Sequence, residues 1–372
     1  MTATVFEPAT LSLAQTARAD DTDRIRHELW WTVVRALDTS GLPYCILGAP
    51  AGLCSATESD IDFVVHPNDY DKVPQLLAAA ARRSGAQLVQ AIAHESTATY
   101  FAIGRQCGCD VAFVNPDCTT DYRRDGRLWL SAEELLRDRF RNSAGFFRPS
   151  PEIDFKYYLI KQVLKRTLTH GQWRKLTSLY RTSQYPQVAL SLWPAETRAE
   201  IERVLGQDRA AMFSNLLPRL SLELKRSPLH ENFAERMAAS GRELARLTRR
   251  ALHPTGLFVR ITNGVSNQRY RLGLQLSHAV APAFRRIRVA HSSVNMLLAL
   301  IASTLVVAPE SVVSAPCGGI RLRWHPELRP EENLDTAIAT VMSHLSRRTM
   351  RRLGLQPAQA YAIERAADAR AC

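Results

Sequence analysis

The sequence predicts a mixed α/β chain of the α+β type, in which a mixed sheet is followed by a helical region and then by a small α/β module. Short apolar strands and amphipathic helices mix up to about residue 115. Helical spacing of apolar residues then dominates from Ser131 to about Arg250. A short strand followed by a helix-like segment begins again after Gly256. These three stretches define the expected fold class and its order along the chain.

The first part of the chain opens with a polar stretch and then a helix. Acidic residues between Asp20 and Asp23 offer caps for this helix, and apolar residues over 25–37 recur at helical spacing. The helix is expected to end at Gly41-Leu42-Pro43. Runs of apolar residues then predict strands over 44–48, 60–65, 86–93, 97–104 and 109–115, with a further helix over 69–83.

The character of the sequence changes to helical at Ser131, which begins a near capping box. A Pro149-Ser150-Pro151 break precedes an amphipathic helix over 152–167. The segment His253-Pro254-Thr255-Gly256 is typical of a linker. The expected regions are a flexible leader (1–20), a sheet domain (21–130), a helical domain (131–250) and a small α/β module (251–372).

The composition is that of a globular protein with a basic C-terminal third. Of 372 residues, 46% are hydrophobic and 23% are charged, which excludes a disordered or collagen-like chain. The sequence has neither a long apolar run nor a secretory signal, so we expect a cytoplasmic protein without a transmembrane segment. The net charge is +12, and residues 241–372 hold 19 Arg against 8 acidic residues. Nucleic acid is a possible partner, but no basic motif interleaved with aromatic residues supports it.

Carboxylates carry the strongest chemical signal in the sequence. Asp60 and Asp62 are separated by one residue on a predicted strand, so their side chains project from the same face. Two such carboxylates repel each other unless a cation lies between them, and Mg²⁺ or Mn²⁺ would resolve this. Asp110, on a neighbouring predicted strand, would add a third ligand for a two-metal centre. Gly48 ends the preceding strand and would let the backbone approach a phosphate closely.

This pattern resembles the nucleotidyltransferase superfamily, which has the DNA polymerase β-like fold. Its signature is an apolar strand ending in Gly-Ser or Gly-Gly, then an Asp-x-Asp strand, then a third acid, and the correspondence covers roughly residues 25–116. The resemblance implies catalytic, metal-binding roles for Asp60, Asp62 and Asp110. One departure is that Ala49 follows Gly48, which removes a hydroxyl that could grip a triphosphate. The nucleotide-binding positions implied here are Gly48, Ala49 and Ser59.

The helix expected over 152–167 adds basic residues. Lys161 and Lys165 are four residues apart and therefore share one helix face. Beside the sheet, such a pair could hold the β- and γ-phosphates of a nucleotide. The alternative is a solvated helix face, the usual fate of Lys. Four of the six Lys residues of the chain fall between positions 156 and 175, which favours the phosphate-binding interpretation.

The segment from Gly256 to Tyr270 has the layout of strand, polar turn and helix. It resembles the phosphate loop of thymidylate-kinase-like proteins, although Gln268 stands where that family carries Lys and Arg269 where it carries Ser or Thr. The resemblance implies a degenerate kinase module that does not grip ATP, with Arg269 expected to point away from the loop. The order of nucleotidyltransferase-like, helical and kinase-like parts resembles that of bacterial two-module proteins, some of which are associated with cell-surface polysaccharide production. An unrelated βα unit is the alternative.

Two classes of function follow from these patterns. The first is a metal-dependent nucleotidyltransferase that moves a nucleoside monophosphate from an NTP to an acceptor hydroxyl or phosphate. The second is a non-catalytic nucleotide-fold protein with a binding or regulatory role and a decayed kinase module. The sequence names neither the nucleobase, nor the acceptor, nor the oligomeric state.

Overall fold

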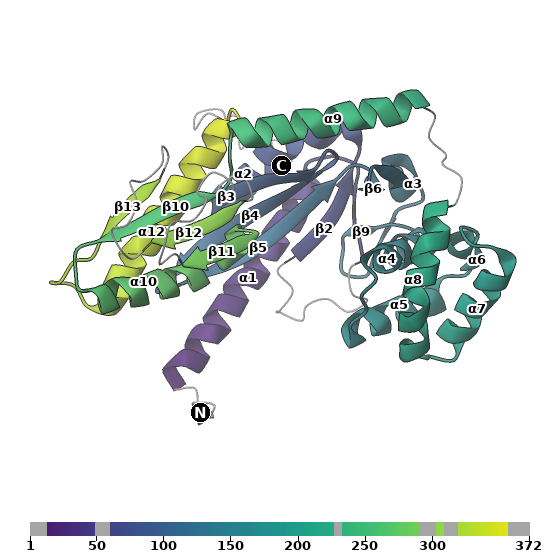
Figure 1. The fold of residues 1–372 in the computed structure, drawn as a ribbon, viewed down its shortest axis with the longest axis horizontal. Helices are drawn as coiled ribbons and strands as arrows, with labels where there is room; N and C mark the ends of the chain where they lie inside the picture. The colour runs from purple at the N-terminus through teal and green to yellow at the C-terminus, as the bar shows by residue number, and fades with distance from the viewer. Residues whose placement is uncertain (1–12, 49–59, 227–232, 290–302, 309–318, 356–372) are drawn as a thin grey trace.

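The structure is a computed structural model that describes residues 13–48, 60–226, 233–289, 303–308 and 319–355. It contains an N-terminal mixed sheet, a helical middle part and a C-terminal parallel sheet (Figure 1). The predicted mixed α/β class and the order of its three parts are confirmed. Across the described ranges, no helix is long and apolar enough to cross a membrane.

The N-terminal sheet has five strands in the order β1-β2-β5-β4-β3. Strands β2 and β5 run parallel, and the other neighbouring pairs are antiparallel. All five lie close to the predicted ranges, but the last continues to Thr119 instead of ending near residue 115. Their bounds are β1 Tyr44–Ile46, β2 Asp60–Val65, β3 Gln87–Glu95, β4 Ala98–Cys107 and β5 Asp110–Thr119.

Two helices, α1 (Leu13–Thr39) and α2 (Val73–Arg83), cover one face of this sheet, and the 3₁₀ helix η1 (Pro67–Lys72) leads into α2. As predicted, α1 ends before Gly41, whose φ of +75° favours glycine. Residues 13–20 belong to α1 and not to the expected flexible leader, and this stretch contains Ala, Gln and Arg, which are good helix formers.

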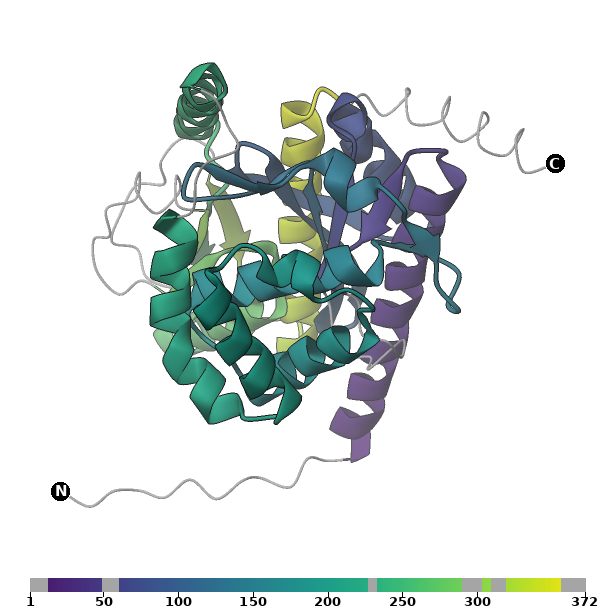
Figure 2. The ribbon, with the colours of Figure 1, turned by 90° about the vertical axis from the view of Figure 1, so that its right-hand side faces the viewer.

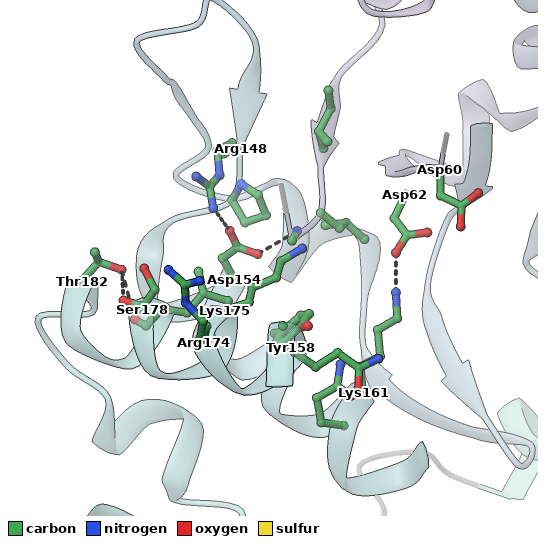
Figure 3. Close-up of a pocket in the computed structure, with 18 of the residues that line it drawn as sticks. Asp60, Asp62, Arg148, Asp154, Tyr158, Lys161, Arg174, Lys175, Ser178 and Thr182 are labelled. Carbon is green, nitrogen blue, oxygen red and sulfur yellow. Dashed lines mark hydrogen bonds and ion pairs between the residues drawn. The ribbon is translucent and has the colours of Figure 1, made fainter. Parts of the chain in front are cut away.

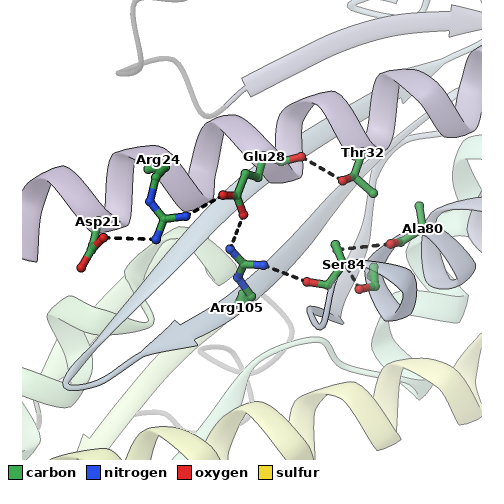
Figure 4. A network of polar contacts seen from close by, with 8 residues as sticks. Asp21, Arg24, Glu28, Thr32, Ala80, Ser84 and Arg105 are labelled. Carbon is green, nitrogen blue, oxygen red and sulfur yellow. Dashed lines mark hydrogen bonds and ion pairs between the residues drawn. The ribbon is translucent and has the colours of Figure 1, made fainter.

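A network of charged side chains joins α1 to β4 and to the end of α2 (Figure 4). Glu28 accepts hydrogen bonds from Arg24 (2.7 Å) and from Arg105 (2.6 Å), and Arg105 also donates to the carbonyl of Ser84 (3.0 Å). The hydrogen bond from Arg105 lowers the pKa of Glu28. Because exposed ion pairs contribute little to stability, we infer that the network mainly orients α1 on the sheet.

The helical part packs against the opposite face of the sheet, at β1 and β2. Its core includes Phe155, Leu176 and Phe213 together with Cys45 and Val64 of those two strands. Ser131 caps the first helix as predicted, because its hydroxyl accepts from the N–H of Glu134 (3.1 Å). The helices are α3 Ala132–Leu136, α4 Pro151–Lys165, α5 His170–Thr182, α6 Gln187–Leu190, α7 Ala195–Gly206 and α8 Ala210–Arg226; two short hairpins, β6 Tyr122–Arg124 with β7 Arg127–Leu130 and β8 Phe140–Arg141 with β9 Phe147–Arg148, precede α4.

The C-terminal part contains a parallel sheet in the order β11-β12-β10-β13. Its core is continuous with the N-terminal sheet, because Val89 and Phe113 pack in the same cluster as Leu257, Val307 and Ile338. The elements are α9 Phe233–Leu252, β10 Leu257–Thr262, α10 Ser266–Ala279, η2 Ala281–Ala283, β11 Arg286–Val289, β12 Thr304–Ala308, β13 Ile320–Arg323 and α12 Pro330–Arg352.

The shared core means that the expected region 251–372 does not pack separately from the N-terminal sheet. The expected linker is also held in place: Thr255 and Gly256 are buried, and Arg348 of α12 donates to the carbonyls of Gly256 (2.7 Å) and Pro254. The helical core and the C-terminal core therefore pack on the same face of the N-terminal sheet. The helical core covers β1 and β2, and the C-terminal core covers β3, β4 and β5.

Replacing Arg348 with Ala is expected to loosen this junction, since it leaves two carbonyls without their donor at a cost of about 1–3 kcal/mol each. We expect a lower melting temperature and faster tryptic cleavage after Arg249 and Arg250. Arg347, the exposed neighbour on α12, provides the control. Equal cleavage rates in the Arg348→Ala and Arg347→Ala variants would contradict this interpretation of the junction.

Candidate functional site: carboxylates beside a basic cleft

Asp60 and Asp62 project from the face of the N-terminal sheet that α1 and α2 do not cover. Between and after them, Ile61 and Phe63 are buried in the core beneath those helices. The alternation of side chains along β2 thus places both carboxylates on the other face, as predicted. They lie between the helical core, which includes Val64, and the C-terminal core.

The third acid on this face is Asp117 and not Asp110. In the parallel pairing of β2 and β5, Asp62 is the register partner of Asp117, and Asp60 is the partner of Asn115. Asp110 begins β5 at its turn with β4, opposite Cys107, and is exposed. At about 3.3 Å per residue, the seven steps along β5 from Asp110 to Asp117 separate the two acids by roughly 23 Å. The predicted convergence of Asp110 with Asp60 and Asp62 is therefore wrong.

Asp117 occupies an unusual environment for a carboxylate. Its side chain is 31% exposed, yet its Oδ1 is buried and has no hydrogen-bond partner in the described part of the chain. Burial and the neighbouring Asp62 raise the pKa of Asp117 to about 8. Nε2 of His94 lies 3.6 Å from Oδ2, but burial lowers the pKa of His94 to about 4, so the imidazole is neutral near pH 7 and offers no positive charge.

Lys161 of α4 forms an ion pair with Asp62 (Figure 3). Burial alone would lower the pKa of Lys161, but the Asp62 carboxylate outweighs it and raises that pKa above its ordinary value. The ammonium also donates to the hydroxyl of Tyr157 (3.2 Å). The helical part thus supplies a positive charge directly at the carboxylates. The predicted neighbour Lys165 is more exposed, and burial together with the charge of Lys161 lowers its pKa.

Gly48, at the end of β1, is attached to the helical part through a buried carboxylate. Asp154 of α4 is 1% exposed; its Oδ1 accepts from the N–H of Gly48 (3.0 Å) and its Oδ2 from Arg148. Because that N–H is already bonded, it is not free to donate to a phosphate. The φ of +58° and the close packing are what require glycine: a Cβ here would lie 3.3 Å from Nζ of Lys175 and 3.5 Å from Tyr158.

An open cleft of about 900 Å³ lies between the sheet and the helical part, and Asp62, Asp154 and Lys161 line it (Figure 3). Asp117, the register partner of Asp62, is not part of this lining. The structure brings together in this cleft five of the predicted site residues, Gly48, Asp60, Asp62, Lys161 and Lys165. Ala49 and Ser59 lie outside the described residues. The cleft further contains basic and hydroxyl side chains that sequence reasoning missed, namely Arg148, Arg174, Lys175, Ser178 and Thr182.

The donor set at the carboxylates suits a hard divalent cation. Asp60, Asp62 and Asp117 offer only oxygen ligands, and the buried Oδ1 of Asp117 is an acceptor that a cation would satisfy. Among the residues that the structure describes, no group of three or more His, Cys, Asp or Glu side chains is arranged to hold a metal ion. Mg²⁺ is commonly held by one or two carboxylates together with substrate phosphates. The residues therefore fit a cation that arrives with a nucleotide.

The C-terminal part forms a second wall beside these carboxylates. Tyr100, the register partner of Asp117 on β4, donates its hydroxyl to the carbonyl of Pro282 in η2 (2.7 Å). Asn115, the register partner of Asp60, donates to the same carbonyl (3.3 Å). The carboxylates are thus flanked by elements from all three parts of the chain.

The turn between β10 and α10 is filled by protein side chains. Gln268 accepts from the N–H of Val265 (3.2 Å), so it caps the helix. A Cβ on Gly264 would lie 2.7 Å from Trp324, which means that the indole packs directly on the turn. The guanidinium of Arg269 donates to the carbonyl of Gly264 (3.1 Å), and the expectation that it points away from the loop is wrong, because a long side chain can fold back onto the preceding turn.

In comparisons with known proteins, no family model, no curated protein and no solved structure matches the chain.

Proposed function

We propose that the chain is a metal-dependent nucleotidyltransferase, which moves a nucleoside monophosphate from an NTP to an acceptor hydroxyl or phosphate. The observation that carries the proposal is the juxtaposition of Asp62 and Asp117 on parallel strands, with Asp60 on the same face, beside a cleft lined by basic side chains. The resemblance of Gly48, Asp60 and Asp62 to the nucleotidyltransferase pattern supports the same reaction. We also propose that the C-terminal part is a degenerate kinase-like module. The packing of Trp324 on the turn at Gly264 supports this, because the indole occupies the place where a phosphate would bind.

Each group of residues has a distinct task in this proposal. Asp60, Asp62 and Asp117 would hold Mg²⁺ or Mn²⁺, which supplies charge neutralisation at the phosphorus undergoing substitution. Lys161, Lys165 and Lys175 would neutralise the triphosphate along the cleft. Burial and Asp62 hold the pKa of Asp117 at about 8, so without a cation this carboxyl group is largely protonated at pH 7. A cation bound there would lower that pKa and convert the group into a carboxylate ligand.

A second candidate function is nucleotide binding without transfer. The observation that favours it is the ion pair between Lys161 and Asp62, which neutralises one carboxylate without a metal ion. A binding protein that has lost catalysis would keep such a pair permanently. In an enzyme, the ammonium of Lys161 would exchange its partner, from Asp62 to a substrate phosphate, when the nucleotide enters.

Label transfer distinguishes the two functions. The purified chain is incubated with each α-labelled NTP, with Mg²⁺ or Mn²⁺, and with a cell extract as the source of acceptors. We expect covalent transfer of the label, its complete loss in EDTA, and its loss in the Asp62→Asn variant. Saturable nucleotide binding without transfer under any of these conditions would favour the binding protein and contradict the proposed enzyme.

A further inference from the structure

A second cleft, of about 590 Å³, lies at the β3 edge of the N-terminal sheet. Ala91 and Phe101 line it, and both belong to the core beneath α1 and α2. The cleft is at the sheet edge farthest from β1, two strands beyond β5, which carries Asp117. Helix α9, which runs along the top of the molecule in Figure 1 and stands apart from the helical part in Figure 2, forms its outer wall.

Arginine dominates the charged lining of this cleft. Five Arg side chains line it against two acidic ones, Asp71 and Glu95, which leaves a formal excess of three positive charges (5 − 2 = 3). Four of the five come from α9 at spacings of four, seven and eight residues, so they share one helix face. The five are Arg242, Arg246, Arg249, Arg250 and Arg352.

Protein acceptors use only part of the hydrogen-bonding capacity of these side chains. Arg246 pairs with Glu243 and donates to the carbonyl of Ala93 (2.8 Å), and Arg352 donates to the carbonyl of Ala91. Both carbonyls belong to the edge strand β3, which among the described strands has no neighbour on that side to donate to them. A guanidinium has five N–H donors, so further donors remain for a ligand.

Within the described ranges of the chain, no ion pair joins three of these arginines, Arg242, Arg249 and Arg352, to an acidic side chain. Burial lowers the pKa of Arg352 to about 10, which reflects the cost of placing a guanidinium there without a counter-charge. An anion in the cleft would remove that cost.

The remaining walls and the size of the cleft indicate what kind of anion it takes. Tyr70, Pro74, Phe101 and Leu353 provide aromatic and apolar surface for an organic group. The row from Arg242 to Arg250 covers eight residues, or about 12 Å of helix, which suits one small molecule better than a polymer. On its outer side α9 is apolar, with Met237, Leu244 and Leu247 exposed, so the basic surface does not continue across this helix.

We propose that this arginine cleft is a second binding site, which takes a small organic phosphate, such as a nucleoside or sugar phosphate. Arg242 and Arg249 bind the phosphate groups, Arg352 supplies further donors, and the apolar wall contacts the organic part. The site is separate from the carboxylates and does not depend on a metal ion or on the proposed transfer reaction.

Calorimetric titration in EDTA tests this site without interference from metal-dependent binding at the carboxylates. The probes are inorganic pyrophosphate and ADP, added to the full-length chain. We expect saturable binding of both, with ADP tighter than pyrophosphate because it also contacts the apolar wall. The double variant Arg242→Ala/Arg249→Ala should weaken both by at least about tenfold. Since both arginines are exposed, its melting temperature should match that of the wild type.

A matched variant completes the design. Arg347→Ala/Arg351→Ala removes the same charge from the exposed side of α12, and it should bind both probes within about twofold of the wild type. Three results would overturn the proposal: no saturable binding of either probe, equal weakening in both double variants, or a single-stranded oligonucleotide that displaces ADP and binds much more tightly.

Discussion

Replacing Asp117 with Asn is expected to abolish label transfer, whereas replacing Asp110 with Asn is expected to leave it unchanged. Asp117 lies beside Asp62 in the parallel register, and its loss removes a proposed metal ligand. A reduction of at least about 100-fold in the transfer rate is expected. Asp110 serves as the matched control because it lies on the same strand, at its far end.

The stability of the Asp117→Asn variant separates loss of function from loss of fold. In EDTA the substitution removes a carboxylate whose ionised form is disfavoured by burial and by Asp62, so the melting temperature should stay the same or rise. Loss of activity together with a large fall in melting temperature would show that Asp117 is required for folding. Equal activity of the Asp117→Asn and Asp110→Asn variants would contradict the assignment of the third acid.

Replacing Asp154 with Ala is expected to destabilise the protein by about 3–5 kcal/mol. This substitution leaves the largely buried guanidinium of Arg148 without its partner and the N–H of Gly48 without its acceptor. A buried charge left alone costs far more than an exposed ion pair contributes. The change in the free energy of unfolding can be measured by urea denaturation.

Glu200→Ala provides the control for Asp154→Ala, because it also removes a carboxylate that pairs with an arginine, Arg219, but on an exposed helix surface. That variant is expected to lose no more than about 1 kcal/mol. If both variants lost the same small amount, the connection of Gly48 to α4 through Asp154 would not stabilise the fold.

Most of the elements could be predicted from the sequence, because their apolar spacing is regular and their ends carry clear signals. The caps and breaks at Ser131 and Gly41 lie where the structure has them. The alternation of side chains along a strand is enough to place Asp60 and Asp62 on one face of the sheet.

The sequence assigns the third acid wrongly because the predicted strand, over 109–115, ends before Asp117 and contains Asp110. In the structure β5 continues through Pro116, which pairs with Ile61 of β2. The register between two parallel strands depends on packing across the whole sheet, and no local pattern specifies it.

Local sequence patterns also could not predict which residues of the helical and C-terminal parts reach the site. Lys175 and Asp154 lie more than 100 residues from Gly48 in the sequence, and only the packing of α4 and α5 on β1 brings them to it. Similarly, the expected linker near Gly256 is held by Arg348, which comes from a helix much later in the chain. The positions of these side chains depend on tertiary contacts. Secondary-structure propensity and hydrophobic periodicity describe only single helices and strands.

Mn²⁺ binding, followed by electron paramagnetic resonance in the presence of a non-hydrolysable NTP, tests the central claim most directly, because it requires no knowledge of the acceptor. The claim is that Asp60, Asp62 and Asp117 form a cation site completed by a nucleotide. We expect the wild-type chain and the Asp110→Asn variant to bind Mn²⁺ saturably in a nucleotide-dependent manner, and the Asp62→Asn and Asp117→Asn variants to lose that binding. Mn²⁺ binding that is absent from the wild type, or that is equal in all four proteins, would contradict the claim.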